Sequence, residues 1–290
     1  PQREAVLYTE GPLLVFAGAG SGKTRVITNR IAYLIAEKNV SPSKILAVTF
    51  TKKAATEMVE RISSILRDLD PNIKQMPTVG TFHSVGANIL RKHAKEVGLT
   101  NNFSIYDSDD SENIIKDLLL ERDIDIKQIK PSAISYFIGA AKNEMISPAQ
   151  FPMHYGGYIE DIVADIYPLY QKQLLAQNSV DFGDLLFLPV KILEENNEIR
   201  RQYEENIKYL LIDEYQDTNT AQYRFAKVLS EKNKNICVVG DDDQGIYAWR
   251  GADIKNIQSF EKDFDNVKVI KLEQNYRSTK NVIKAAVCVI

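Results

Sequence analysis

The chain of 290 residues is 44% hydrophobic and 26% charged, which is typical of soluble globular proteins with one large domain or two smaller ones. It contains no apolar run of the roughly 18 residues that span a membrane and no basic, apolar leader, so we expect a cytoplasmic protein without a membrane partner. The formal net charge of −3 argues mildly against a nucleic-acid binder but does not exclude a local basic groove.

Strand and helix patterns alternate through the first part of the chain. Short apolar runs with the length of buried strands are each followed by a segment with helical spacing, and this rhythm predicts a parallel sheet covered on both faces. In chain order, the expected elements are a strand at 13–17, a helix at 23–37, a strand at 45–50, a helix at 53–67, a strand at 78–82 and a helix from about Ser84.

A helical and polar stretch interrupts this alternation from about residue 89 to 182, and it contains no strong strand pattern. Helices are expected at 106–121, where aspartates can cap the first turn, and at 131–145, which opens with proline and serine. Apolar strands then return at 209–215, 235–241 and 267–273.

These patterns predict an α/β fold in which one parallel sheet is interrupted by a helical insertion. The predicted divisions are a first core segment 1–88, the insertion 89–182 and a second core segment 183–290. The segment 281–290 reads as a helix cut while still apolar, so we expect a fragment of a longer protein. The two cysteines, Cys237 and Cys288, lack metal-ligand spacing and a disulfide context, as expected in a reducing cytosol.

A glycine-rich loop joins the first strand to the first helix. In "AGAGSGKT" (17–24), glycines let the backbone approach a ligand closely, and N–H groups at a helix start bind phosphate. Lys23 can reach the β- and γ-phosphates and the Thr24 hydroxyl can bind Mg²⁺, although Ala17 replaces the usual leading glycine. The candidate nucleotide-binding residues of this loop are Gly18, Ala19, Gly20, Ser21, Gly22, Lys23, Thr24 and Arg25.

Two acidic residues follow one another at the end of the apolar strand "YLLIDEY" (209–215). A phosphate-binding loop needs a carboxylate partner for Mg²⁺, and Asp213 is the candidate. Glu214 beside it could orient and deprotonate the attacking water. Two solvated acids at a strand end are the alternative interpretation, but the phosphate loop expected in the same sheet favours the metal site. We therefore predict a bound nucleotide with Mg²⁺; the resemblance described below implies that the nucleotide is ATP.

Seven motifs follow one another along the chain: "AGAGSGKT" (17–24), "AVTFTKKAATEM" (47–58), "GTFHS" (80–84), "VDFGDLL" (180–186), "DEYQDTN" (213–219), "GDDDQGIYAWRGAD" (240–253) and "LEQNYRST" (272–279). In this order they resemble the motifs of the UvrD/Rep/PcrA-type superfamily 1 DNA helicases. The resemblance spans essentially the whole chain. It implies a RecA-like P-loop NTPase fold and an ATP-driven translocase that moves 3′ to 5′ on single-stranded DNA and unwinds duplex.

The resemblance implies roles for further residues around the nucleotide. Gln2 matches the adenine-recognising glutamine of the family, since an amide can both donate to and accept from the base edge. Tyr276 is implied to stack on adenine, Arg277 to approach the γ-phosphate, and Gln244 to sense that phosphate. The implied catalytic residues are Lys23, Glu214, Gln244 and Arg277.

A track for single-stranded DNA is also implied. Hydroxyl groups, a helix N-terminus and a lysine suit phosphate contacts, and aromatic rings can stack on bases. The candidate DNA-binding residues are Thr49, Phe50, Thr51, Lys52, Thr81, His83, Ser84, Tyr247, Trp249 and Arg250. A lone tryptophan is more often part of a core, but Trp249 lies after a strand among glycines, which favours stacking. Gly183 replaces a carboxylate that is frequent in the family, and no role is assigned to it.

The expected partners are single-stranded DNA, 3′-tailed duplex DNA and a second RecA-like domain of the same protein, which would complete the ATP cleft. Two alternative functions remain open: a helicase-related subunit of a recombination nuclease, and a P-loop regulatory module that binds nucleotide but no DNA. Phe50, Trp249 and the "GTFHS" motif favour the helicase over the regulatory module. Without the second domain, we expect the chain alone to be a poor ATPase.

Overall fold

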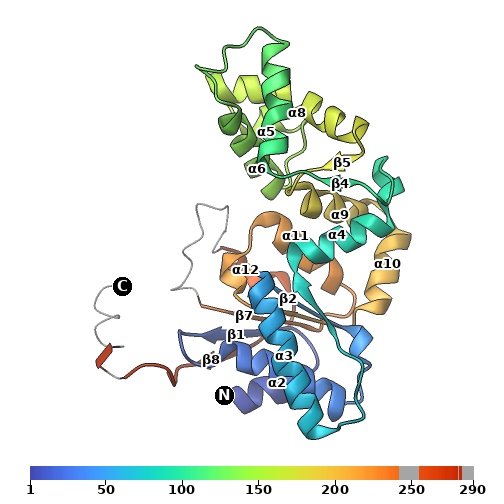
Figure 1. Cartoon of the computed structure of the whole chain (residues 1–290). Helices are drawn as coiled ribbons and strands as arrows, with labels where there is room; N and C mark the ends of the chain where they lie inside the picture. The colour runs from blue at the N-terminus through green and yellow to red at the C-terminus, as the bar shows by residue number, and fades with distance from the viewer. Residues whose placement is uncertain (242–254, 280, 283–290) are drawn as a thin grey trace. The chain divides into compact units, whose positions relative to one another are not determined.

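The computed structural model describes residues 1–241, 255–279 and 281–282 (Figure 1). The chain forms two compact units. The sheet unit consists of Pro1–Phe82, Glu198–Asn219 and Ala226–Ile290, and the helical unit consists of His83–Asn197 and Thr220–Phe225. Three helices, α4 (Phe82–Lys92), α10 (Asn197–Asn206) and α11 (Thr220–Ser230), contain residues of both units.

The sheet unit is built on a six-stranded sheet with the order β3-β2-β6-β7-β1-β8, in which every recorded strand pair is parallel. The strands are β1 (Leu13–Ala17), β2 (Ile45–Thr49), β3 (Thr78–Thr81), β6 (Tyr209–Ile212), β7 (Ile236–Gly240) and β8 (Lys268–Leu272). The predicted α/β fold with a parallel sheet is confirmed. Parallel strands require crossover connections, and the alternating sequence pattern supplied them.

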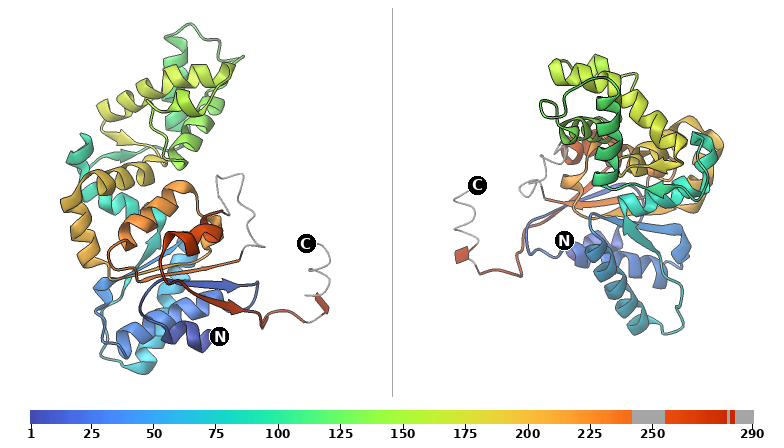
Figure 2. Two further views of the ribbon diagram at one scale, coloured as in Figure 1. Left: turned by 180° about the vertical axis from the view of Figure 1, so that it is seen from behind. Right: turned by 45° about the horizontal axis from the view of Figure 1, so that its top comes forward.

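Helices cover both faces of this sheet, which explains why its four central strands are continuous apolar runs rather than alternating ones. On one face, α1 (Gln2–Leu7), α2 (Lys23–Ala36) and α3 (Lys52–Leu69) share a core with the strands, containing Ala5, Ile27 and Met58. On the opposite face lies α12 (Lys255–Asp263), as Figure 2 shows. Its Phe260 ring meets Tyr215 edge to face, with the ring centroids 5.8 Å apart. The remaining elements of this unit are the short turns η1 (Pro42–Lys44) and η3 (Tyr215–Asp217).

The helical unit has its own apolar core, formed chiefly by three helices that include Ile115, Ile138 and Tyr167. Its elements are α4 (Phe82–Lys92), η2 (Ala94–Val97), β4 (Ser104–Ile105), α5 (Ser108–Leu120), α6 (Pro131–Asn143), α7 (Phe151–His154), α8 (Tyr158–Ala176), β5 (Ser179–Val180) and α9 (Asp184–Glu195). The predicted helix starts are confirmed at α5, where Asp107 and Asp110 form a capping box, and at α6, which opens on Pro131.

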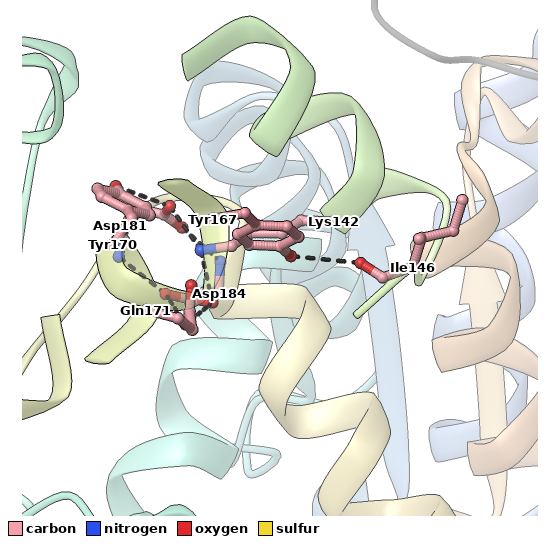
Figure 3. Close-up of polar contacts among 7 residues, drawn as sticks. All are labelled: Lys142, Ile146, Tyr167, Tyr170, Gln171, Asp181 and Asp184. Carbon is pink, nitrogen blue, oxygen red and sulfur yellow. Dashed lines mark hydrogen bonds and ion pairs between the residues drawn. The ribbon is translucent and has the colours of Figure 1, made fainter. Parts of the chain in front are cut away.

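A buried ion cluster lies in the helical unit (Figure 3). Lys142 of α6 is 1% exposed, and its Nζ lies 2.6 Å from Asp181 and 2.8 Å from Asp184. The Tyr170 hydroxyl donates to Asp181 at 3.0 Å, and the Gln171 amide donates to Asp184 at 3.0 Å. Burial raises the pKa of Asp184 to about 6, with the neighbouring Asp181 charge adding to the effect. The cluster joins α6, α8 and the loop before α9.

The loop at the ion cluster explains the glycine that departs from the family pattern. A Cβ atom on Gly183 would lie 2.9 Å from Cδ of Lys142, closer than a side chain tolerates. The loop is also closed on itself, because the Asp184 N–H donates to Asp181 Oδ1 at 2.9 Å. Gly183 is therefore required by packing against the buried lysine.

Several elements differ from the expectations. The strand pair β4–β5 was missed, because two-residue strands show no periodicity. The strand β6 ends at Ile212, since Glu214 adopts a left-handed conformation with φ of 54°. Helix α4 begins at Phe82 rather than near Ser84. None of the helices in the described ranges is long and apolar enough to cross a bilayer.

Candidate functional site

The P-loop between β1 and α2 is folded by two glycines in the left-handed region. Gly20 has φ of 73° and Gly22 has φ of 93°, conformations that other residues adopt only at a cost. The Ser21 hydroxyl donates to the Gly18 carbonyl at 2.7 Å and closes the loop. No side chain caps the start of α2. The first N–H groups of that helix, which have no intrahelical partner, are therefore placed to bind an anion.

Lys23 and Glu214 form an ion pair across neighbouring elements of the site. The Lys23 Nζ lies 3.0 Å from Glu214 Oε2, and the two side chains are 9% and 40% exposed. The pair lacks hydrogen-bond geometry, so the buried Nζ has no hydrogen-bond partner in the described chain. An ammonium group with three donors is costly to bury in this way. A phosphate group fits this unmet need.

A hydroxyl and a buried carboxylate meet beside the lysine. The Thr24 hydroxyl donates to Asp213 Oδ2 at 3.1 Å, and Asp213 is 6% exposed. Burial raises the pKa of Asp213 to about 6, and the adjacent Glu214 charge adds to this effect. Among the described residues, no group of three His, Cys, Asp or Glu could hold a metal. The Thr24 hydroxyl and the Asp213 carboxylate suit Mg²⁺, which is often held by one or two carboxylates while phosphates complete its coordination.

Sequence reasoning missed a residue that orients Glu214. Gln216 is 2% exposed; its amide donates to Glu214 Oε2 at 2.9 Å and its carbonyl accepts from the Asp241 N–H at 3.0 Å. It thereby connects the end of β6 to the end of β7. The sequence pattern that could have revealed Gln216 is "DEYQD", in which a glutamine closely follows two acidic residues at a strand end.

The segment after β8 returns to the P-loop. The Asn275 amide donates to the Ala19 carbonyl, and the Tyr276 N–H donates to the Gly20 carbonyl at 2.9 Å. Asn275 also accepts from the Arg277 N–H at 2.8 Å. A Cβ atom on Gly20 would lie only 2.6 Å from the Arg277 Cβ. Asn275, a residue to which the sequence assigned no role, thus holds Tyr276 and Arg277 beside the P-loop.

The structure therefore brings several predicted nucleotide-site residues together. Gln2 reaches the loop from α1, and its amide donates to the Ser21 carbonyl at 2.6 Å. Lys23, Thr24, Asp213 and Glu214 form one connected cluster. The Arg25 side chain follows on the first turn of α2. Gln244 lies outside the described residues, so its predicted contact with the γ-phosphate stays a prediction.

The predicted DNA residues at the end of β2 have structural partners. Thr51 caps α3 by accepting from the Ala54 N–H at 3.1 Å, and the buried Thr49 donates to the Thr51 carbonyl at 3.1 Å. The Phe50 ring packs edge to face on Phe82 at 5.7 Å. Capping explains Thr51 without DNA, whereas Lys52 is exposed at the helix start.

The remaining predicted DNA residues fall into three places. Thr81 ends β3 in the sheet unit, while His83 and the exposed Ser84 lie on α4. His83 stacks on Phe182, with ring centroids 4.0 Å apart, and Phe182 is 60% exposed. The sequence assigned no role to Phe182. The predicted residues Tyr247, Trp249 and Arg250 lie outside the described ranges.

The half-buried position of His83 predicts a pH dependence of folding. Burial lowers the pKa of His83 from 6.5 to about 4, so the unfolded chain binds its proton more tightly. The resulting stability is present above pH 6.5 and falls as the pH decreases toward 4. We expect His83→Gln to show a smaller loss of urea midpoint between pH 7 and pH 5 than the parent chain. The exposed His154→Gln should keep the parent's dependence, and equal pH dependence in all three would contradict this account.

Comparison with known proteins identifies relatives of this chain. Residues 1–265 match the model of the UvrD/REP helicase N-terminal domain family. The chain is 52% identical over 285 residues to the protein named ATP-dependent DNA helicase PcrA of Bacillus subtilis (strain 168). It is 48% identical over 285 residues to proteins of the same name from Staphylococcus aureus (strain Mu50) and Staphylococcus epidermidis (strain ATCC 35984).

These matches cover 98% of this chain but 38% of each relative, so the chain spans little more than a third of their length. The family match, by contrast, includes nearly every residue of the chain, and it extends over both the P-loop and the "DEYQD" motif. The resemblance predicted from the seven motifs is thereby confirmed, and the chain belongs to the UvrD/REP helicase N-terminal domain family.

Proposed function

We propose that this chain is the ATP-binding core of an ATP-dependent DNA helicase. The observation that carries the proposal is the buried Lys23 ammonium, which has no hydrogen-bond partner in the described chain and lies 3.0 Å from Glu214 at an uncapped helix start. The relatives' printed names support the same activity. Family membership supports the helicase over the nuclease subunit and the regulatory module.

Different residues around the P-loop are proposed to contact the phosphates, the Mg²⁺ ion and the base of ATP. Backbone N–H groups of the loop and Lys23 hold the phosphates, and Gln2 faces the adenine. Thr24 and Asp213 would hold Mg²⁺, which neutralises charge on the phosphates when bound. The Asp213 carboxyl binds a metal in its deprotonated form, and a nearby Mg²⁺ would favour that deprotonation. Tyr276 stacks on the base, and its exposed ring supports this role.

Glu214 is the proposed general base for the attacking water. Gln216 donates a hydrogen bond to one of its carboxylate oxygens, and Lys23 forms an ion pair with the same oxygen. Arg277, held beside the loop by Asn275, is placed to stabilise charge that develops on the γ-phosphate. Gln244 is proposed as the residue that senses this phosphate.

DNA binding is proposed to combine backbone contacts with base stacking. Phe50, Lys52 and the predicted residues of "GTFHS" supply these contacts, together with Trp249. In the helical unit, the exposed Phe182 ring stacked on His83 supports a further stacking position. Because the His83 imidazole is neutral at pH 7, its contribution is not that of a cation.

For the whole protein we propose 3′ to 5′ movement on single-stranded DNA, unwinding of 3′-tailed duplex and a cytoplasmic location. The proposed domain organisation keeps the core segments 1–88 and 183–290 and the insertion 89–182. A second RecA-like domain would contribute another arginine to the ATP cleft, and such arginines are worth about 10³–10⁵ in rate.

The test is phosphate release measured with and without saturating single-stranded DNA. We expect DNA to stimulate turnover in a native chain extended through the second core domain, and we expect the 290-residue chain to bind Mg²⁺–ATP but turn over slowly. Glu214→Gln in the extended chain should retain binding and lose about 10²–10⁴ in rate. An equal rate of phosphate release with and without DNA would favour the regulatory module. Rapid turnover by the 290-residue chain would show that its ATP cleft is already complete.

A further inference from the structure

Arg30 of α2 is the largest fully buried side chain of the described residues, at 2% exposure. Its guanidinium donates to three backbone carbonyls: Ala5 at 2.8 Å, Thr9 at 3.2 Å and Tyr8. Within the described ranges, no carboxylate forms an ion pair with it. The ATP chemistry proposed above makes no use of this buried cation.

The three acceptors lie at the C-terminal end of α1 and just beyond it. The last carbonyls of a helix lack intrahelical partners and carry the negative end of its dipole. A guanidinium presents five N–H donors in a rigid fork, so it can satisfy several carbonyls at once. Arg30 therefore closes the end of α1, and a smaller or apolar side chain would leave these buried carbonyls unpaired.

Apart from Arg30, apolar packing also holds α1, since Ala5 lies in the core and Val6 packs against it. The helix has six residues, of which Ala5 is the buried one. A helix of this length does not form alone in water. Glu4 pairs with Lys268 of β8 at 2.7 Å, but their side chains are 55% and 41% exposed, and exposed pairs contribute little. Arg30 therefore adds to this packing the hydrogen bonds that fix the C-terminal end of α1.

Helix α1 begins with the residue proposed to face the nucleotide base. One Gln2 N–H is already committed to the Ser21 carbonyl at 2.6 Å, which leaves the second N–H and the amide oxygen for the base. Adenine offers an acceptor at N7 and a donor at N6, whereas guanine offers acceptors at both N7 and O6. A Cβ on Gly22 would lie 2.8 Å from Gln2 Nε2, so the glycine leaves free the space that the Gln2 amide occupies.

We propose that Arg30 is a positioning residue for base selection. By fixing α1 from its C-terminal end, it holds the Gln2 amide in the orientation that accepts adenine and rejects guanine. The inference rests on the proposed function, because it requires a nucleotide on the P-loop. Arg30 acts through α1 and Gln2 and does not touch the nucleotide.

Calorimetry of the full chain with Mg²⁺ and the β,γ-imido analogues of ATP and GTP tests this role. We expect a roughly tenfold preference for the adenine analogue, the size of about one base-edge hydrogen bond. Gln2→Ala should bring the ratio close to one, and Arg30→Met should bring it to a similar value. The double variant should lose no further selectivity, because both changes remove the same interaction. Arg30→Lys keeps the positive charge but loses the planar guanidinium donors, so it should give an intermediate ratio of ATP-analogue to GTP-analogue affinity. It also replaces Arg30→Met in the test if that variant does not fold.

Arg91→Met is the matched control. Arg91 also donates to two backbone carbonyls, those of Asn101 and Phe103, but it lies in the helical unit, so the ratio should not change. An Arg30 variant that weakens both nucleotides equally would overturn the proposal and leave Arg30 with a structural role. An unchanged ratio in Gln2→Ala would also overturn it. The proposed ATP site itself would still stand if Lys23→Ala lost both nucleotides, so the two failures are distinguishable.

Discussion

Replacing Lys23 with alanine is expected to lower the affinity of the chain for Mg²⁺–ATP about 10- to 100-fold, the loss of one hydrogen bond to a charged group. The ammonium is buried with no hydrogen-bond partner in the described chain, so it meets a phosphate without breaking an existing hydrogen bond. Its removal also leaves Glu214 without its cation, next to Asp213. In an extended chain, turnover should fall further than binding, because the lysine also stabilises the transition state.

Calorimetry with Mg²⁺ and a non-hydrolysable ATP analogue measures this effect. Lys38→Ala is the matched control, since Lys38 is an exposed lysine just beyond the C-terminal end of the same helix. The control should bind as the parent chain does. Equal affinities of the parent chain and Lys23→Ala would contradict the P-loop assignment.

Lys142→Met is expected to destabilise the helical unit by about 3–5 kcal/mol. The substitution keeps much of the apolar stem but leaves Asp181 and Asp184 buried together without a cation. Their repulsion and lost solvation produce the penalty. The deficit should narrow as the pH falls from 7 to 5, because protonation neutralises a carboxylate. A triple variant that also carries Asp181→Asn and Asp184→Asn should recover most of the loss.

Hydrogen exchange resolved over α6 and α8 reports on this unit separately from the sheet unit. Lys172→Met, which alters an exposed lysine of α8, should change protection by no more than about 0.5 kcal/mol. Parent-like protection in Lys142→Met would show that the cluster contributes no net stability. Recovery in the triple variant separates loss of the cation from loss of packing.

The core of the sheet was predictable because its four central strands are short apolar runs with clear boundaries. The expected strand 13–17 coincides with β1, and the expected strand 235–241 exceeds β7 by one residue at each end. The P-loop and the acids after β6 were also predictable, since parallel strands end at one edge of the sheet and bring their following residues together.

Other features depend on contacts between distant residues, which periodicity does not reveal. Lys142 reads as a solvated helix lysine, yet its partners lie about 40 positions further along the chain. Arg30 looks like a surface arginine on an amphipathic helix, although it is buried against carbonyls that precede it by more than 20 positions. Sequence patterns locate elements and motifs, but they do not show which polar side chain will hydrogen-bond a given buried backbone group.

The close packing of Gly20 limits what a mutational scan of the P-loop can report. Gly20 faces the Asn275–Arg277 turn with no space for a Cβ, so any substitution pushes the proposed arginine away from the loop. A defect measured at this position combines altered phosphate contacts with a displaced Arg277 and is not attributable to either alone. Gly20 and the Asn275–Arg277 turn are therefore packed as one unit, and we expect a larger residue at position 20 to require a compensating change in that turn.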